Sequence, residues 1–214
     1  MLKALLFDFG GVLAEEGFRE GLKAIGKKND LDPDRFFTLA DALIFESGYL
    51  TGRADETEYW DALRERTGIA GSNEELREEL LKRFVLRPGM IAAVDRLRSR
   101  GFLVAMLSDP TNWLEELDRE TFLGRHFDKI FNSFTLHKSK RDESIFQDVC
   151  SDLGVKTGEA LFIDDNINHI RRAEGAGLLT IHFTTFNDFE KQLCDYLEPA
   201  QARSRRRVCQ QNNY

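Results

Sequence analysis

Four short apolar segments, each followed by a polar or charged side chain, constrain the fold of this chain more than any other feature. They span residues 2–7, 102–107, 129–134 and 160–163. The segment 129–134 is the weakest, because it contains polar residues. Short runs that are apolar at nearly every position are typical of strands buried on both faces, as in a parallel sheet covered by helices. The sequence therefore predicts an α/β fold.

The side chains that follow these segments are chemically complementary. Asp8 closes the first segment, Ser108 and Asp109 follow the second, Lys138 and Lys140 follow the third, and Asp164 and Asp165 follow the fourth. In open α/β sheets, ligands bind beyond the carboxyl ends of the strands, so we expect these groups to line one crevice. Gly10 and Gly11 allow the chain to turn sharply there and to approach a ligand closely. An aspartate in that position serves as a nucleophile, a metal ligand or both.

Helical patterns alternate with the predicted strands over the second half of the chain. We expect helices over 88–100 and near 112–124, 141–153, 167–176 and 187–197, and a further strand from 178. Such alternation favours a mostly parallel sheet with right-handed crossovers. The predicted fold class is thus a doubly wound, mostly parallel, Rossmann-like sheet. Its core is built from residues 1–14 and 87–197.

Residues 15–86 interrupt this core with helical patterns and no convincing strand. The first helix is expected over 17–28, the second from Asp32 and the third over 54–66. The fourth is expected from Ser72, because a Ser followed three residues later by Glu75 is a capping-box pattern. The aromatic residues of these helices are expected to form a bundle core. We therefore predict an inserted helical-bundle cap.

The order Asp, Ser, Lys, Asp-Asp resembles that of the haloacid dehalogenase-like hydrolase superfamily. The resemblance covers residues 1–197. The stretch Phe162–Asn166, with Ala173 and Gly177, is most similar to the helical-cap branch that contains sugar-phosphate phosphatases and the phosphatase domain of epoxide hydrolases. This resemblance implies a phosphatase that acts on a small phosphorylated metabolite through an aspartyl-phosphate intermediate. The cap would close over the phosphate site and select the substrate.

The resemblance also implies the roles of the site residues. Asp8 would attack phosphorus, Ser108 and Lys140 would hold phosphoryl oxygens, and Mg²⁺ would be the cofactor. The ion prefers oxygen ligands in octahedral geometry, which Asp8, Asp165 and the carbonyl of Gly10 would supply. Asp164 is expected either as a further ligand or as an outer acceptor that holds a metal-bound water.

The choice between the two lysines depends on local structure. Residues 139–142 have the pattern of a helix start, with Lys140 in the first turn, where a helix amino end favours a bound anion. Lys138 remains an alternative, because Arg141 stands where relatives usually have proline after the lysine. Asn166 is expected to support the acidic pair or to cap the next helix. His169 is expected on a helix surface.

One position departs from the family pattern. Most phosphatases of the superfamily carry a second Asp two residues after the nucleophile, which protonates the leaving oxygen; here that position is Gly10. General acid–base catalysis is typically worth about 10²–10⁴ in rate, so a substitute acid is expected. Asp109 is the first candidate, and His137, Glu15 and Glu16 are weaker ones.

Charge and composition limit the remaining classes of function. The net charge of −7 argues against a nucleic-acid surface, and no apolar stretch is long enough to span a bilayer. Cys150, Cys194 and Cys209 lack metal-site spacing, which favours a reducing cytoplasm. The basic tail, 198–214, is expected to be disordered. A metal-independent 2-haloacid dehalogenase and a catalytically weak binding or regulatory protein are the alternatives, although the pair Asp164-Asp165 argues against the dehalogenase.

Overall fold

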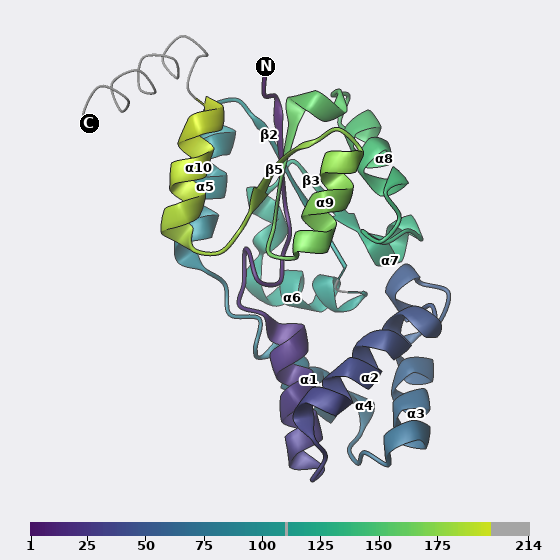
Figure 1. Cartoon of the computed structure of the whole chain (residues 1–214). Helices are drawn as coiled ribbons and strands as arrows, with labels where there is room; N and C mark the ends of the chain where they lie inside the picture. Colours follow the sequence, from purple (N-terminus) through teal and green to yellow (C-terminus); the bar gives the residue numbers. More distant parts are fainter. Residues whose placement is uncertain (110, 198–214) are drawn as a thin grey trace, which may run out of the picture.

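The computed structural model describes residues 1–109 and 111–197 (Figure 1). The expectation for the basic tail lies outside the described residues. The described chain has an upper part built around a sheet and a lower part that consists of helices (Figure 1).

The sheet is parallel throughout and has the strand order β3-β2-β1-β4-β5 among the described residues. The strands are β1 (Ala4–Phe7), β2 (Leu103–Ser108), β3 (Lys129–Asn132), β4 (Ala160–Asp164) and β5 (Leu179–His182). The central strand β1 is fully buried, as its continuous apolar sequence predicts. Because the order reverses at β1, the chain crosses to both sides of this strand, which makes the sheet doubly wound. The predicted fold class is confirmed.

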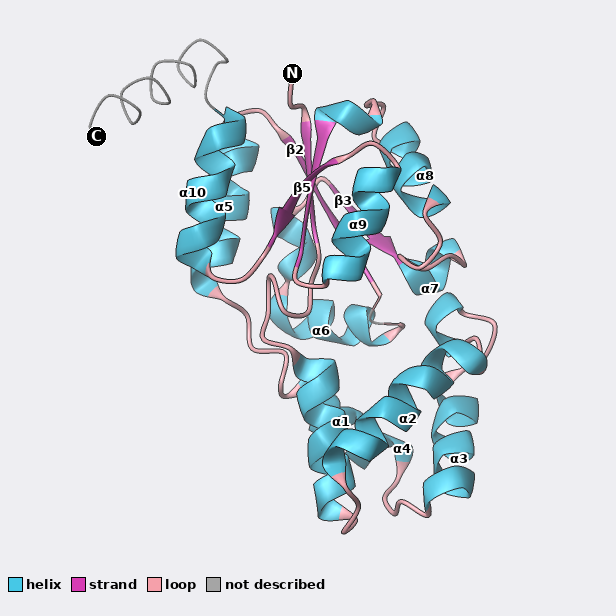
Figure 2. Ribbon diagram, viewed as in Figure 1, coloured by secondary structure: helices cyan, strands magenta, loops and turns pink. Residues whose placement is uncertain are grey.

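Helices cover both faces of the sheet (Figures 1 and 2). On one face lie α5 (Pro88–Ser99), α6 (Trp113–Thr121) and α10 (Phe186–Leu197), and on the other lie α8 (Ser144–Asp152) and α9 (Ile167–Gly175). Alternate residues of β1 point to opposite faces, so Leu5 and Phe7 pack in the first layer and Ala4 and Leu6 in the second. None of the helices within 1–109 and 111–197 is long and apolar enough to cross a membrane.

The helical part comprises α1 (Gly17–Lys28), α2 (Pro33–Glu46), α3 (Glu56–Thr67) and α4 (Asn73–Leu81), with a short 3-10 helix at Tyr49–Thr51. Residues 15–86 contribute no strand to the sheet. The capping box predicted at Ser72 is present, since its side chain accepts from the N–H of Glu75 and the Glu75 side chain accepts from its N–H. These helices enclose an apolar core of their own, which includes Leu22, Leu43, Tyr59 and Trp60.

The predicted helix start at residues 139–142 is wrong. These residues form a turn, in which the N–H of Asp142 donates to the carbonyl of Ser139, and α8 begins only at Ser144. The physical reason is the side chain of Asp142, which accepts hydrogen bonds from both the N–H and the hydroxyl of Ser144. A short helix that the sequence did not predict, α7 (Ser133–Leu136), also follows β3.

Candidate active site

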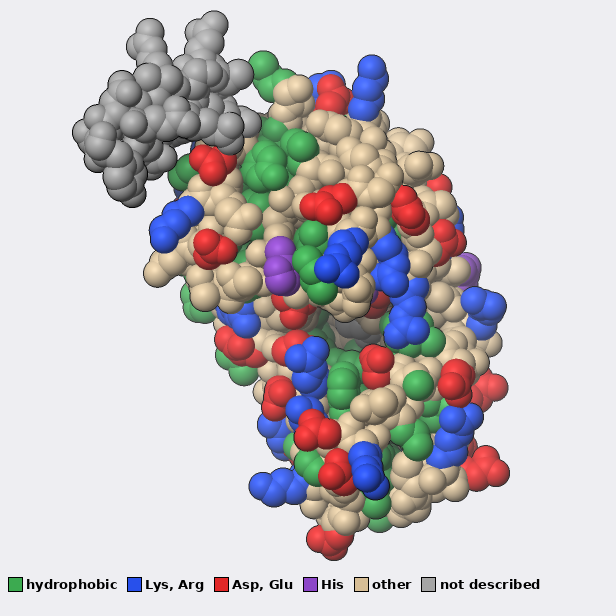
Figure 3. All heavy atoms as spheres, viewed as in Figure 1, with side chains coloured by type: hydrophobic (Ala, Val, Ile, Leu, Met, Phe, Trp, Pro, Cys, Tyr) green, Lys and Arg blue, Asp and Glu red, His purple; other side chains and the backbone are tan. Residues whose placement is uncertain are grey.

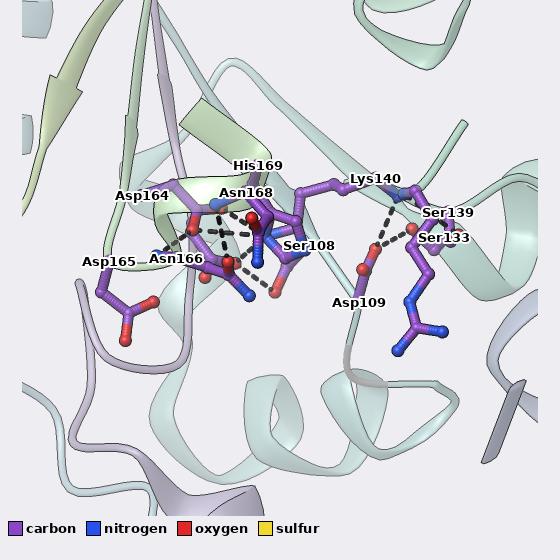
Figure 4. Close-up of polar contacts among 12 residues, drawn as sticks. Ser108, Asp109, Ser133, Ser139, Lys140, Asp164, Asp165, Asn166, Asn168 and His169 are labelled. Atoms are coloured by element: carbon purple, nitrogen blue, oxygen red, sulfur yellow. Dashed lines mark hydrogen bonds and ion pairs between the residues drawn. The ribbon is translucent and has the colours of Figure 1, made fainter. Parts of the chain in front are cut away.

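The carboxyl ends of adjacent strands bring Asp8, Ser108, Lys140 and Asp164 into direct contact. Ser108 Oγ donates to Asp8 Oδ1 over 3.2 Å. Lys140 Nζ lies 2.7 Å from Asp8 Oδ1 and 2.7 Å from Asp164 Oδ2, so it bridges the ends of β1 and β4. The strand order makes this possible, because β1 lies between β2 and β4. The predicted crevice is therefore one hydrogen-bonded cluster (Figure 4).

Three carboxylates in this cluster could hold a cation. Ligand oxygens of Asp8, Asp164 and Asp165 all lie within 4.8 Å of one another. Asp164 is already engaged, by Lys140, by the N–H of Asn166 and by His169. By contrast, no other residue in the described part of the chain donates a hydrogen bond to Asp8 Oδ2 or to the side chain of Asp165. This donor set fits a hard divalent cation bound by Asp8 and Asp165, with Asp164 as an outer acceptor.

Burial and mutual charge determine the protonation of these groups. Burial raises the pKa of Asp8 well above its ordinary value, and the charges of Asp164 and Asp165 add to this against the opposing effect of Lys140. Burial likewise raises the pKa of Asp165, as does the charge of Asp164. For Asp164, burial acts in the same direction, but Lys140 and His169 outweigh it and lower the pKa. A bound cation would remove the unfavourable repulsion between Asp8 and Asp165.

The same carboxylates keep Lys140 charged. Burial favours the neutral form of its amine, but the charges of Asp164 and Asp8 outweigh burial and raise the pKa of Lys140 above its ordinary value. Its side chain is only 1% exposed, so its charge acts on the groups of the site and is little screened by solvent. Lys138, the alternative, contacts Asp148 and Ser144 on the surface instead.

The loop after β1 brings the backbone against the acidic pair. Gly11 has a φ of +81°, which side-chain-bearing residues rarely adopt, and a Cβ there would overlap the carboxylate of Asp165. Gly10 has no such backbone constraint, and a Cβ there would lie 3.3 Å from Phe84 Cε1 and 3.8 Å from Glu16 Oε1. The close approach of Asp165 to the loop therefore requires glycine at Gly11 only.

Residues of α9 support the acidic pair. The side chain of Asn166 caps α9 by accepting from the N–H of Asn168, while its own N–H donates to Asp164, so both predicted roles are present. The prediction that His169 lies on a helix surface is wrong, because its Nδ1 lies 3.1 Å from Asp164 Oδ2 and its side chain is 15% exposed. Helix periodicity could have predicted this contact, because a residue three positions after Asn166 lies on the side of the helix that faces the end of β4.

The predicted substitute acids lie at different places around Gly10. Asp109 accepts hydrogen bonds from the hydroxyl of Ser133 and, over 3.5 Å, from the N–H of Lys140 (Figure 4). His137 contacts the carbonyl of Thr51, and Glu15 pairs with Arg87. Asp109 and Glu16 both line the site, and of the two it is Glu16 that lies beside Gly10. Burial raises the pKa of Glu16, since Arg19 opposes this effect only in part.

A cavity of about 590 Å³ extends from this cluster to the helical part of the molecule. Asp8, Ser108, Lys140 and Asp165 line it from the sheet, and α1 and α2 line it from the opposite side. Figure 3 shows the surface hollowed where the two parts meet. Sequence reasoning did not identify these α1 and α2 residues as part of the site, because their apolar periodicity is the same as that of a bundle core.

Two relatives of the chain are named as phosphatases. It is 24% identical to the glyceraldehyde 3-phosphate phosphatase of Methanopyrus kandleri, over 85% of this chain and 83% of that protein. It is also 24% identical to a sesquiterpene phosphatase of Aspergillus oryzae, over 85% of this chain and 90% of that protein. Among solved structures, the magnesium complex of a HAD family enzyme from Bacteroides thetaiotaomicron is 25% identical, with a TM-score of 0.69 over 86% of this chain and 93% of that one.

Dehalogenases share the fold as well. The L-2-haloacid dehalogenase of Xanthobacter autotrophicus is 19% identical, with a TM-score of 0.63 over 84% of this chain and 76% of that one, a likeness that concerns the fold alone. The model of the haloacid dehalogenase-like hydrolases matches residues 2–177, which is most of the chain. This chain is therefore a hydrolase and belongs to the haloacid dehalogenase-like hydrolase family.

Proposed function

We propose that this protein is a Mg²⁺-dependent phosphatase that hydrolyses a small phosphorylated metabolite through an aspartyl-phosphate intermediate. The observation that carries the proposal is the cluster of Asp8, Ser108, Lys140 and the acidic pair at one sheet edge. The phosphatase relatives support the class of reaction. The acidic pair also favours it over a metal-independent dehalogenase, which has no phosphate dianion to neutralise.

Asp8 is the nucleophile in this proposal. Ser108 and Lys140 both bind Oδ1. In this proposal one carboxylate oxygen of Asp8 attacks phosphorus and the other is left to bind the cation. Attack forms the bond from an Asp8 carboxylate oxygen to phosphorus and breaks the bond from phosphorus to the ester oxygen, which leaves as an alcohol after it takes up a proton. Water then cleaves the aspartyl phosphate and releases inorganic phosphate. Ser108 and Lys140 orient the phosphoryl oxygens and oppose their charge.

In this proposal Asp8, Asp165 and the carbonyl of Gly10 would hold the cofactor, with Asp164 in the outer shell; the grouping of the three carboxylates supports this. When bound, Mg²⁺ supplies positive charge that offsets the repulsion between the carboxylates and the phosphate dianion. Asp164 meanwhile holds Lys140 and His169 in place.

For the leaving-group proton, the geometry favours Glu16 over Asp109. Glu16 lies next to Gly10, the position at which relatives carry their acid, and a raised pKa keeps a larger share of it protonated. The carboxylate of Asp109 is instead occupied by Ser133 and the N–H of Lys140.

The test is hydrolysis of an aryl phosphate with and without Mg²⁺. We expect Asp8→Asn to abolish turnover and Asp165→Asn to raise the Mg²⁺ concentration needed for half-maximal rate by about 10-fold or more. Asp148→Asn is the matched surface change, at the partner of Lys138. It should leave turnover and the Mg²⁺ requirement unchanged. Turnover that survives a chelator would overturn the proposal. Chelator-resistant release of halide from a 2-haloacid would favour the dehalogenase, and no turnover of either ester or haloacid would favour the binding protein.

A further inference from the structure

The cavity has one polar end and one apolar side. The polar end is the cluster around Asp8 and Lys140, and the opposite side is formed by large apolar side chains that face it. This aromatic wall consists of Phe18, Phe37, Ile44, Phe45, Leu50 and Trp113. A phosphate bound at Asp8 would therefore direct the rest of its ester toward the aromatic wall.

Helix α2 supplies the centre of this wall. Phe37, Asp41 and Phe45 are spaced by four residues and thus share one face of the helix, which lines the cavity. The ring of Phe18 packs edge-on against Phe37, with 6.4 Å between the ring centroids, and lies 6.3 Å from Trp113. These contacts make the aromatic wall continuous from α1 to the core.

The charged side chains that α1 and α2 place beside the aromatic wall each face a partner. The carboxylate of Asp41 lies 3.7 Å from the guanidinium of Arg141, which also stacks over Phe45. Arg19 lies over the ring of Phe37 and beside Glu16. The indole N–H of Trp113 donates away from the cavity, to Glu56 Oε1 over 3.0 Å. A leaving group that lies against the aromatic wall would find apolar contact there, whereas the polar lining residues Asn168 and Arg172 belong to α9, outside this wall.

We infer that the phosphate esters bound here carry a hydrocarbon leaving group, alkyl or aryl, rather than a polyhydroxylated sugar. This inference rests on the proposed function, since it places the phosphate at Asp8. A sugar hydroxyl that loses its water against this wall without a new partner is destabilising. A hydrocarbon chain gains from the same burial, by about fourfold in affinity for each methylene removed from water.

The experiment measures, by calorimetry, the binding of n-alkylphosphonates from ethyl to octyl to the full-length protein in the presence of Mg²⁺. These compounds keep the phosphate-like head and are not hydrolysed, so the result does not depend on turnover. We expect the dissociation constant to fall about two- to fourfold per added methylene until the cavity is filled. An affinity that is independent of chain length would overturn the inference.

A matched pair of variants on α2 tests the aromatic wall itself. Phe37→Ala should flatten the dependence on chain length, while Leu39→Ala, which removes a side chain of the same helix outside this cavity, should preserve it. If Phe37→Ala lowers the melting temperature sharply, Phe45→Leu provides the second variant, with a partial flattening expected. A preserved dependence in a folded Phe37 or Phe45 variant would contradict the inference.

Turnover separates failure of this inference from failure of the proposed function. Faster hydrolysis of sugar phosphates than of n-alkyl phosphates, with loss of both in Asp8→Asn, would leave the phosphatase intact and overturn the hydrocarbon preference. If no ester is hydrolysed but the affinity still rises with chain length, the proposed phosphatase function is overturned. The preference of the cavity for hydrocarbon groups is then retained.

Discussion

At the scale of single residues, two adjacent glycines have different reasons to be glycine. Gly11 combines a left-handed backbone with direct contact to Asp165. Gly10 stands where most phosphatases of the family carry a second Asp. The first is a structural requirement of the site, and the second is a chemical difference from relatives.

We therefore predict a larger effect for Gly11→Ala than for Gly10→Ala. Gly11→Ala should cost about 1–2 kcal/mol in unfolding free energy through backbone strain and should displace Asp165, which weakens activation by Mg²⁺. Gly10→Ala should change stability by less than about 1 kcal/mol, because only the ring of Phe84 must shift slightly. Urea unfolding and Mg²⁺ titration of activity measure both effects. Equal costs at the two positions would show that this account of the loop is wrong.

The source of the leaving-group proton is also a question of single residues. We predict that Glu16→Gln lowers kcat/KM for alkyl phosphates about 10²-fold, with little effect on esters whose leaving groups need no proton, such as nitrophenyl phosphate. The slope of log rate against leaving-group pKa should steepen accordingly. Asp109→Asn is the comparison, since its carboxylate faces Ser133. If the slope steepens in Asp109→Asn and does not change in Glu16→Gln, the acid is Asp109.

At the scale of elements, helix α4 is held to α1 by a buried carboxylate. Glu79 is 3% exposed and binds Lys28 of α1, Lys82 and Arg83. Burial alone would raise the pKa of Glu79, but the hydrogen bonds from Lys28, Lys82 and Arg83 outweigh it and lower the pKa to about 2. The charged form is thus bound more strongly in the folded protein than in the unfolded chain.

This lowered pKa predicts how stability depends on pH. A carboxylate whose pKa is depressed by folding stabilises the protein above its unfolded pKa of about 4.3 and loses that effect as the pH falls toward 2. Glu79→Gln should lower the unfolding free energy by about 1–3 kcal/mol at pH 7, and the difference from the wild type should shrink between about pH 4.5 and 2. Glu78→Gln on the exposed face of α4 is the control for urea unfolding. If the difference in unfolding free energy between the wild type and Glu79→Gln is the same at every pH, the charge of Glu79 is not its cause.

At the scale of the whole molecule, Trp113 joins the helical part to the sheet. It belongs to α6 of the core, yet it is 1% exposed and packs in the apolar core of the helical part, with its ring 5.4 Å from Tyr49 and 5.9 Å from Trp60. The hydrogen bond from its indole to Glu56 and that from Tyr49 to Asn112 cross the same boundary. The helical part and the sheet thus meet in a tightly packed interface.

We predict that the two parts unfold as one unit and that Trp113→Ala uncouples them. The truncation should cost about 3–5 kcal/mol, because it leaves a large cavity between the parts. Circular dichroism and tryptophan fluorescence should report one coincident urea transition in the wild type and separate transitions in the variant. Phe122→Ala, at the exposed end of the same helix, should cost less than about 1 kcal/mol. Two transitions in the wild type would contradict the coupling.

The sequence by itself determined the alternation of strands and helices, the parallel sheet, the helical insert and the order of Asp8, Ser108, the lysine and the acidic pair. These follow from local periodicity, from capping residues such as Ser72 and from the rule that polar groups at strand ends meet at one edge. The sequence favoured Lys140 and left Lys138 as an alternative. Only the tertiary structure shows Lys140 in contact with Asp164, Lys138 paired with Asp148 on the surface, and His169 in contact with Asp164.

Other features depend on contacts between distant segments. Glu16 beside Gly10, the aromatic wall over the phosphate site and Trp113 in the core of the helical part all join residues that no local pattern relates. Amphipathic periodicity tells which face of a helix is buried, but it is the same whether that face meets a neighbouring helix or a substrate. The helix start at Ser144 was missed because the side chain of Asp142, which accepts two hydrogen bonds from Ser144, forms a turn before the helix. The sequence thus fixes which groups are available for chemistry, and packing decides which of them meet.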